Sequence, residues 1–396
     1  MIKIGLDNIE QILSTVKDRK IGLITNHTGL NAEFISNIEI FKKLFKKNFI
    51  RVFTPEHGLY GDEQAGIPVD SYHDNNLDIE ITSLYGNSGS LDDIDLSMRE
   101  NDTSYTKKGM PLNFIEDIDV LFFDLQDIGT RIYTYVSTMI LSMEACMHKN
   151  KEFVVLDRPN PISGSVEGPV LDKKFRSFIG IMEVPIRHGM TVGELARFYN
   201  DFYLNSSLNL KIIKMENWKR NLYYDETGIP WIIPSPNIPT LNSAIVYPGQ
   251  VLFEGINISE GRGTTKPFEI IGSPWIDSYK LAREMNTSNI KGVKFREVHF
   301  IPEFSKYKNN KCNGVELYIT DIKQYKPYFT SLKLIKKIME MSYTNFKFYD
   351  KYFDMVNGTD KIRKALIENI DINNLIDDIS NMDNNFIANY NNILLY

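Results

Sequence analysis

The segment FTPEHGLYGDEQAG, residues 53–66, contains residue types that acid–base chemistry requires. It places Glu56 and His57 directly after a proline, and three glycines follow before the segment ends. A carboxyl group that is partly shielded from water keeps its proton near neutral pH and can donate it to a leaving group. Glu56 is therefore a candidate general acid, or alternatively a glutamate that caps a helix or pairs with an arginine. His57 is a candidate base or substrate ligand, or alternatively a packed, hydrogen-bonded histidine.

Similar polar motifs follow other short apolar runs. IGLIT leads into Asn26, VLFFDLQ leads into Asp127 and Arg131, and FVVLD leads into Asp157 and Arg158. In open α/β sheets the ligand crevice lies beyond the carboxyl ends of the strands, where loops carry the chemistry. We therefore expect these side chains to converge on one site.

The surrounding elements alternate in type. Apolar runs predict strands at residues 20–25, 50–54, 79–86, 119–126 and 152–157. Helical spacing predicts helices at residues 33–46, 133–149 and 190–203, the last with a capping box formed by Thr191 and Glu194. This alternation is typical of a mostly parallel sheet with helices on both faces, so the fold class is α/β and Rossmann-like.

A proline-rich stretch at residues 234–239 marks the predicted domain boundary. We expect residues 1–235 to form a Rossmann-like catalytic domain. We expect residues 236–396, with mixed strand and helix signals, to form a smaller α+β auxiliary domain.

Asp127 is better placed than Asp124 to face the crevice, because Asp124 lies inside the apolar run and needs a partner if it is buried. Arg131 could bind an anionic substrate group through two hydrogen bonds, or it could form an internal ion pair with Asp127. Tyr133 follows in the same segment, and VPIRHGMT places Arg187 and His188 before the helix at 191.

The segment EGINISEGRGTTKPFE, residues 254–269, is too polar and glycine-rich to be core. It carries Asn257, Glu260, Arg262 and Thr264. It is either a mobile flap over the crevice or a long connection.

Several classes of function are disfavoured. The chain lacks G-x-G-x-x-G, a P-loop, H-E-x-x-H and G-x-S-x-G, and its six histidines are scattered, so we expect no cofactor and no metal. The net charge of −6 with dispersed lysines argues against nucleic acid, and no run of about 18 apolar residues predicts a membrane span. The N-terminus MIKIGLDNIEQIL shows no secretory signal, so we expect a cytoplasmic location, although a trimmed exported protein would look the same. The remaining carboxylates, arginines, amides and aromatics suit cleavage of a small glycoside substrate.

These motifs together resemble the exo-acting β-N-acetylmuramidases, a glycoside hydrolase family formerly catalogued as a domain of unknown function. The motifs that carry the resemblance occur in order from about Gly5 onward: IGLITNHTGL, FTPEHGLYGDEQAG, FDLQDIGTRIYTY, VLDRPNPISG, EGPVLD, VPIRHGMTVGELA, PSPNIPTLNSAIVYPG, EGINISEGRGTTKPFEIIG and FSKYKNNKCNGVELYIT.

The resemblance implies a site in a cleft between the two domains. It also implies hydrolysis of the β-1,4 bond that links a non-reducing terminal N-acetylmuramic acid to N-acetylglucosamine in peptidoglycan fragments. The glutamate of the family's P-E-H-G motif, here Glu56, is the implied catalytic residue. Asp127, Glu260 or the substrate's own acetamido group could provide the second function.

A lactyl carboxylate on the substrate would give Arg131, Arg187 or Arg262 a role. The alternative is a protein that binds muropeptides or amino sugars without cleaving them. We make no prediction of the oligomeric state.

Overall fold

The computed structural model describes residues 2–86, 110–381 and 384–396. Within these residues the N-terminal half forms a seven-stranded sheet in the order β3-β4-β2-β1-β5-β6-β9. The strands are β1 (Ile21–Thr25), β2 (Phe49–Thr54), β3 (Tyr72–Asp74), β4 (Ile79–Ser83), β5 (Val120–Asp124), β6 (Glu152–Leu156) and β9 (Leu210–Ile213). All neighbouring strands are parallel except β3, which runs antiparallel to β4 at one edge. The Rossmann-like sheet that the sequence predicted is confirmed.

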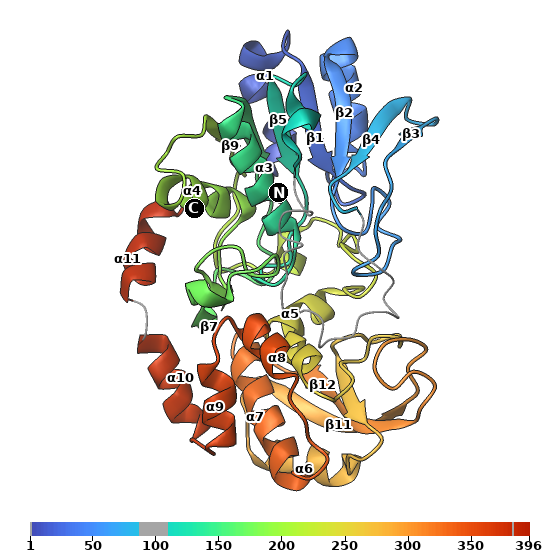
Figure 1. Ribbon diagram of the computed structural model, residues 1–396, viewed down its shortest axis with the longest axis vertical. Helices are drawn as coiled ribbons and strands as arrows, with labels where there is room; N and C mark the ends of the chain where they lie inside the picture. Colours follow the sequence, from blue (N-terminus) through green and yellow to red (C-terminus); the bar gives the residue numbers. More distant parts are fainter. Residues whose placement is uncertain (1, 87–109, 382–383) are drawn as a thin grey trace.

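Helices cover both faces of this sheet (Figure 1). They are α1 (Glu10–Val16), α2 (Asn37–Phe45), α3 (Tyr135–His148) and α4 (Val192–Phe202). Alternate residues of β5 belong to different cores: Phe122 packs with Phe41 of α2, whereas Phe123 belongs to the cluster that contains Met139 of α3. Burial of successive side chains on opposite faces explains why this strand reads as a continuous apolar run.

The second half of the chain forms a smaller domain with a three-stranded antiparallel sheet in the order β10-β12-β11. Its strands are β10 (Ile270–Ser273), β11 (Val293–Phe300) and β12 (Cys312–Ile319). Its helices are α5 (Leu241–Gln250), α6 (Ser278–Thr287), α7 (Pro327–Met341), α8 (Asp350–Asn357), α9 (Lys361–Ile367) and α10 (Ile372–Asn381). This α+β arrangement also agrees with the sequence prediction.

Two features join the halves. A short hairpin of β7 (Glu167–Val170) and β8 (Pro185–Arg187) contacts α7 and α10 of the second domain. The last helix, α11 (Asn384–Ile393), returns to the first domain and packs beside α4, where Phe386 contacts Phe198 (Figure 1).

Short 3-10 helices also occur among the described residues. They are η1 (Gly5–Asn8), η2 (Lys46–Asn48), η6 (Leu112–Ile115), η7 (Lys173–Phe175), η8 (Tyr224–Thr227) and η9 (Val251–Gly255).

The strand ends lie at one edge, as parallel pairing requires. Thr25 of β1 pairs with Asp124 of β5, and Thr54 of β2 pairs with Ser83 of β4. The loops that follow these strands therefore start side by side, and they point toward the second domain in Figure 1. Among the described residues, none of the helices combines the length and the apolarity needed to cross a bilayer.

Candidate active site

The loop after β2 is folded back on itself by residues in the left-handed region. Gly58, Gly61 and Gly66 have φ values of 76°, 71° and 84°, and His57 has φ 75°. Glycine adopts such angles without a steric cost, which explains why this segment needs three of them. The reversal brings the Gly66 N–H to within 2.8 Å of Glu56 Oε1, where it donates a hydrogen bond.

The other carboxyl oxygen of Glu56 is held from a different element. Thr134, the residue before α3, donates its hydroxyl to Glu56 Oε2 at 2.6 Å. Glu56 is buried, with 6% of its surface exposed. It is therefore a shielded carboxyl group at a strand end, oriented by donors from two elements.

Asp127, after β5, is a second carboxyl group, and few hydrogen bonds offset the cost of burying it. Its Oδ2 accepts the Gly129 N–H at 2.7 Å, while its Oδ1 is buried with no hydrogen-bond partner among the described residues. Burial raises the pKa of Asp127 to about 7. A carboxyl group that titrates near neutral pH is suited to accept or donate a proton.

His188 faces Asp127 from the end of β8. Its Nε2 lies 3.9 Å from Asp127 Oδ2, beyond hydrogen-bond distance, and this Nε2 also has no partner among the described residues. Burial lowers the pKa of His188 to about 3, so the ring is neutral. Because His188 Nδ1 accepts the Met190 N–H at 3.1 Å, we assign the ring proton to Nε2, on the side of Asp127.

Glu260, the third candidate, is in a different environment. Lys306 Nζ lies 3.1 Å from Glu260 Oε2, and Arg262 Nε lies 3.5 Å from Glu260 Oε1. Arg262 Nη2 also contacts Glu254 Oε1 at 2.6 Å, and Tyr352 donates to the other oxygen of Glu254 at 2.8 Å. The segment 254–262 is thus anchored by a buried ion network, which favours the long connection over a mobile flap.

Tyr247 of α5 connects this network with Glu56. Burial raises the pKa of Tyr247 well above its usual value, and the charges of Glu254 and Glu56 raise it further. The charges of both carboxylates therefore reach the Tyr247 hydroxyl, that of Glu56 more weakly than that of Glu254. The Tyr247 ring packs edge-on against Phe268 of the second domain, with centroids 4.7 Å apart, and against Tyr133 of the first, at 6.4 Å. The electrostatic effect of Glu56 therefore extends to a residue at the contact between the domains.

Two of the predicted arginines are engaged within the protein. The Arg131 guanidinium donates to four backbone carbonyls, those of Pro169, Val184, Val356 and Asn357, and not to Asp127. It ties the β7–β8 hairpin to the end of α8.

Arg187 is engaged through a single nitrogen, Nη2, and its Nε is buried with no hydrogen-bond partner among the described residues. It donates to the carbonyl of Ile162 and contacts the hydroxyls of Ser163 and Tyr223 at 3.3 Å. We do not carry Arg131 into the proposed substrate site, and the role of Arg187 toward a substrate stays a prediction.

Arg158 and Asp124 form a buried ion pair with two contacts, at 2.5 and 3.0 Å. Asn37 donates to the same carboxylate at 2.8 Å. This pair supplies the partner that a buried Asp124 was expected to need. Arg158 therefore has a structural role at the β5–β6 edge.

Asp157 is buried and fully hydrogen-bonded. Its oxygens accept the N–H groups of Arg158 and Gly193 and the hydroxyls of Thr191 and Tyr396. Burial raises the pKa of Asp157 to about 7, and it fixes the start of α4 rather than facing open space.

The other predicted ligands also have internal partners. Asn26 donates to the Tyr135 hydroxyl at 2.8 Å, and His57 Nδ1 lies 2.7 Å from the Glu63 carbonyl. Asn257 bonds to the backbone of Asn345 and Lys347, and the Thr264 hydroxyl donates to the Gly261 carbonyl. Tyr133 is buried, with its ring 4.8 Å from that of Tyr135. Their roles toward a substrate stay predictions.

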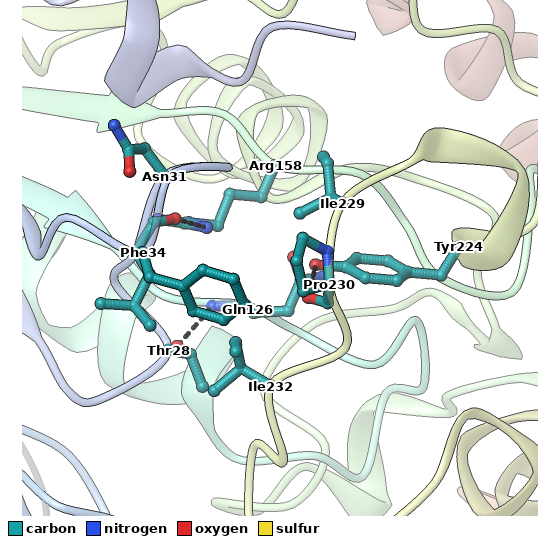
Figure 2. Close-up of a pocket in the computed structure, with 10 residues that line it drawn as sticks. Thr28, Asn31, Phe34, Gln126, Arg158, Tyr224, Ile229, Pro230 and Ile232 are labelled. Carbon is teal, nitrogen blue, oxygen red and sulfur yellow. Dashed lines mark hydrogen bonds between the residues drawn. The ribbon is translucent and has the colours of Figure 1, made fainter. Parts of the chain in front are cut away.

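A shallow recess lies at the same sheet edge, next to the loop after β1. It encloses about 270 Å³, open solvent included, between Phe34 on one side and Pro230 and Ile232 on the other, with Gln126 and Arg158 among its lining residues (Figure 2). Neither Glu56 nor Asp127 lines it. The recess is therefore not the place where the two carboxyl groups meet a substrate.

Three residues of the site escaped the sequence analysis: Thr134, Gly66 and Tyr247. Thr134 lay inside the helix predicted at residues 133–149, whereas α3 begins one residue after it, at Tyr135. Gly66 was considered only as part of the segment 53–66, and Tyr247 lies in the motif PSPNIPTLNSAIVYPG, for which no individual site residue was predicted. Among the described residues, no group of three or more His, Cys, Asp or Glu side chains could hold a metal ion.

The comparisons with known proteins match this chain to one family. Two family models match consecutive parts of the chain: "Exo-beta-N-acetylmuramidase NamZ, N-terminal" over residues 21–242 and "Exo-beta-N-acetylmuramidase NamZ, C-terminal" over residues 245–396. The peptidoglycan beta-N-acetylmuramidase NamZ of Bacillus subtilis (strain 168) is 39% identical over 399 residues, covering 100% of this chain and 91% of that protein.

Solved structures agree. Crystal structures of two DUF1343 family proteins from Bacteroides fragilis NCTC 9343 share 31% and 28% sequence identity with this chain, with TM-scores of 0.85 and 0.74. Each match covers 100% of this chain and 99% of the solved chain.

Proposed function

Because this chain belongs to the exo-β-N-acetylmuramidase NamZ family, we propose that it is a glycoside hydrolase that releases N-acetylmuramic acid from the non-reducing end of peptidoglycan fragments. The bond cleaved is the β-1,4 linkage to N-acetylglucosamine. The observation that carries the proposal is the placement of Glu56, a shielded carboxyl group held by Gly66 and Thr134 where β2 ends.

We assign Glu56 the role of general acid. Its proton passes to the glycosidic oxygen as the bond from that oxygen to C1 of the muramic acid breaks, and N-acetylglucosamine leaves. Water then adds to C1 and releases one proton, either to the Glu56 carboxylate or to a second basic group, in which case Glu56 regains its proton from solvent. The carboxyl group needs a fixed orientation for this step, since proton transfer requires hydrogen-bond distance to the leaving oxygen.

For the second group we prefer Asp127 over Glu260. Both oxygens of Glu260 contact cationic side chains, so its charge is already neutralised. Asp127 has one oxygen without a described partner and a pKa of about 7. Asp127 could act as the base toward water, or it could orient the substrate's acetamido group if the acetamido oxygen attacks C1 first.

Arg262 is the best of the three candidate arginines for the lactyl carboxylate. Its Nε and Nη2 are held by Glu260 and Glu254, whereas its Nη1 makes no hydrogen bond to a described residue. Its side chain is also 18% exposed. Arg262 and Glu56 both act electrostatically on the pKa of Tyr247, in opposite directions.

The direct test is incubation of the protein with a defined muramyl-glucosamine disaccharide, followed by proton NMR of the first anomer released. We expect free N-acetylmuramic acid, and the anomer seen first would distinguish retention from inversion. Binding of the disaccharide with no product on long incubation would contradict hydrolysis and support the sugar-binding alternative. A cytoplasmic site of action stays a prediction, which fractionation of host cells and immunoblotting would check.

A further inference from the structure

Glu56 receives hydrogen bonds on both carboxyl oxygens, and the two donors come from different elements. The Gly66 N–H from the loop after β2 reaches Oε1, and the Thr134 hydroxyl from the start of α3 reaches Oε2. Rotation of the carboxyl plane would break both bonds. The two donors therefore fix the orientation of the group.

Thr134 occupies a position where its hydroxyl would ordinarily serve the helix. It is the N-cap residue of α3, and a threonine there commonly accepts a hydrogen bond from a backbone N–H of the first turn. In this protein the Thr134 side chain makes no cap hydrogen bond. The hydroxyl is directed at Glu56 instead, so its replacement removes little that α3 itself depends on.

We infer that Thr134 is a positioning residue for Glu56, whose hydroxyl aims the carboxyl group at the glycosidic oxygen. The inference rests on the proposed function. Thr134 and Gly66 are both half-buried, and each supplies one hydrogen bond to the buried carboxyl group of Glu56. Loss of the hydroxyl would leave the Gly66 hydrogen bond to Oε1 in place and remove the one that Thr134 makes to Oε2.

The test compares three variants with the wild type on the muramyl-glucosamine disaccharide. Thr134→Val removes the hydroxyl at constant size, and Thr134→Ser keeps it. Thr138→Val makes the same change one turn along α3, at a buried threonine with no described hydrogen bond to Glu56. A hydrogen bond to an ionisable group typically accounts for a tenfold to hundredfold effect.

We expect Thr134→Val to lower kcat by about 10- to 100-fold with KM within about twofold, whereas Thr134→Ser and Thr138→Val stay within about threefold of the wild type. Full turnover in Thr134→Val would overturn the inference. So would equal losses in Thr134→Val and Thr138→Val, which would indicate damage to α3. If Thr134→Val does not fold, Thr134→Ala supplies the same comparison. An inactive wild type would overturn the proposed function itself, which separates the two failures.

Discussion

Replacement of Asp127 by asparagine should stabilise the protein at alkaline pH even as it impairs turnover. The folded protein holds the pKa of Asp127 at about 7, against 3.8 for an unperturbed aspartate, because burial penalises the charged form. The asparagine side chain would keep an oxygen for the Gly129 N–H and would carry no charge at any pH. The substitution therefore removes the cost of burying an ionised carboxylate.

The magnitude follows from the difference between the two pKa values. Below about pH 4 the carboxyl group is protonated in both the folded and the unfolded chain, and the two proteins should be equally stable with respect to this group. Between about pH 4 and pH 7 the unfolded chain ionises and the folded protein does not, so the wild type loses stability as pH rises. From 3.8 to about 7, at about 1.4 kcal/mol per pH unit, the loss reaches an upper limit of about 4 kcal/mol.

The assay is urea denaturation of both proteins at intervals between pH 4 and pH 8.5. We expect the difference in unfolding free energy to grow in favour of Asp127→Asn up to about pH 7 and then to level off. Asp117→Asn, at an exposed site that pairs with Arg51, controls for the substitution itself. A difference that does not depend on pH would refute the reasoning that burial of the Asp127 carboxyl group outweighs the hydrogen bond that it accepts.

Three further predictions concern the loop, the sheet edge and the substrate's carboxylate. Gly66→Ala should cost about 1–2 kcal/mol of stability and lower turnover, because φ of 84° is strained for alanine. The control Gly86→Ala, at a site where an added Cβ meets open space, should change neither stability nor turnover. Thermal unfolding measures the stability and initial rates measure the turnover. Arg158→Met should lower the free energy of unfolding in urea by about 3–5 kcal/mol, because it leaves Asp124 buried without a cation. The double variant with Asp124→Asn should recover part of that stability. A loss below about 1 kcal/mol for Arg158→Met would contradict a stabilising ion pair. Arg262→Lys should lower the preference for N-acetylmuramides over N-acetylglucosaminides by about tenfold or more in kcat/KM, and an unchanged preference would remove Arg262 from the substrate site.

The fold was predictable because its signals are local. The strands of the first domain are short apolar runs that the sheet covers on both faces, and β1, β2, β5 and β6 fall within one or two residues of their predicted bounds. The capping box of Thr191 and Glu194 at the start of α4 was also correct. The β7–β8 hairpin and β10 were missed, because each is only three or four residues long and lacks a clear period.

The site was less predictable because its contacts join distant positions. Nothing near Arg131 in the sequence shows that its guanidinium reaches Val356 and Asn357, 225 and 226 positions away. Glu260 and Asp127 were equivalent candidates until the structure placed cations beside Glu260 and buried Asp127 without one. Sequence identifies residue types, but the partners that set each residue's role come from the tertiary fold.

The central claim, that Glu56 supplies the proton for glycoside cleavage, is tested most directly by the turnover of Glu56→Gln on the muramyl-glucosamine disaccharide. The glutamine side chain keeps an oxygen to accept the Gly66 N–H, and its amide can donate to the Thr134 hydroxyl, so the fold and substrate binding should persist. Glu63→Gln, an exposed change in the same loop, is the matched control. We expect Glu56→Gln to lose at least about 1000-fold in kcat while Glu63→Gln keeps wild-type turnover. Turnover by Glu56→Gln at the wild-type rate would contradict the account.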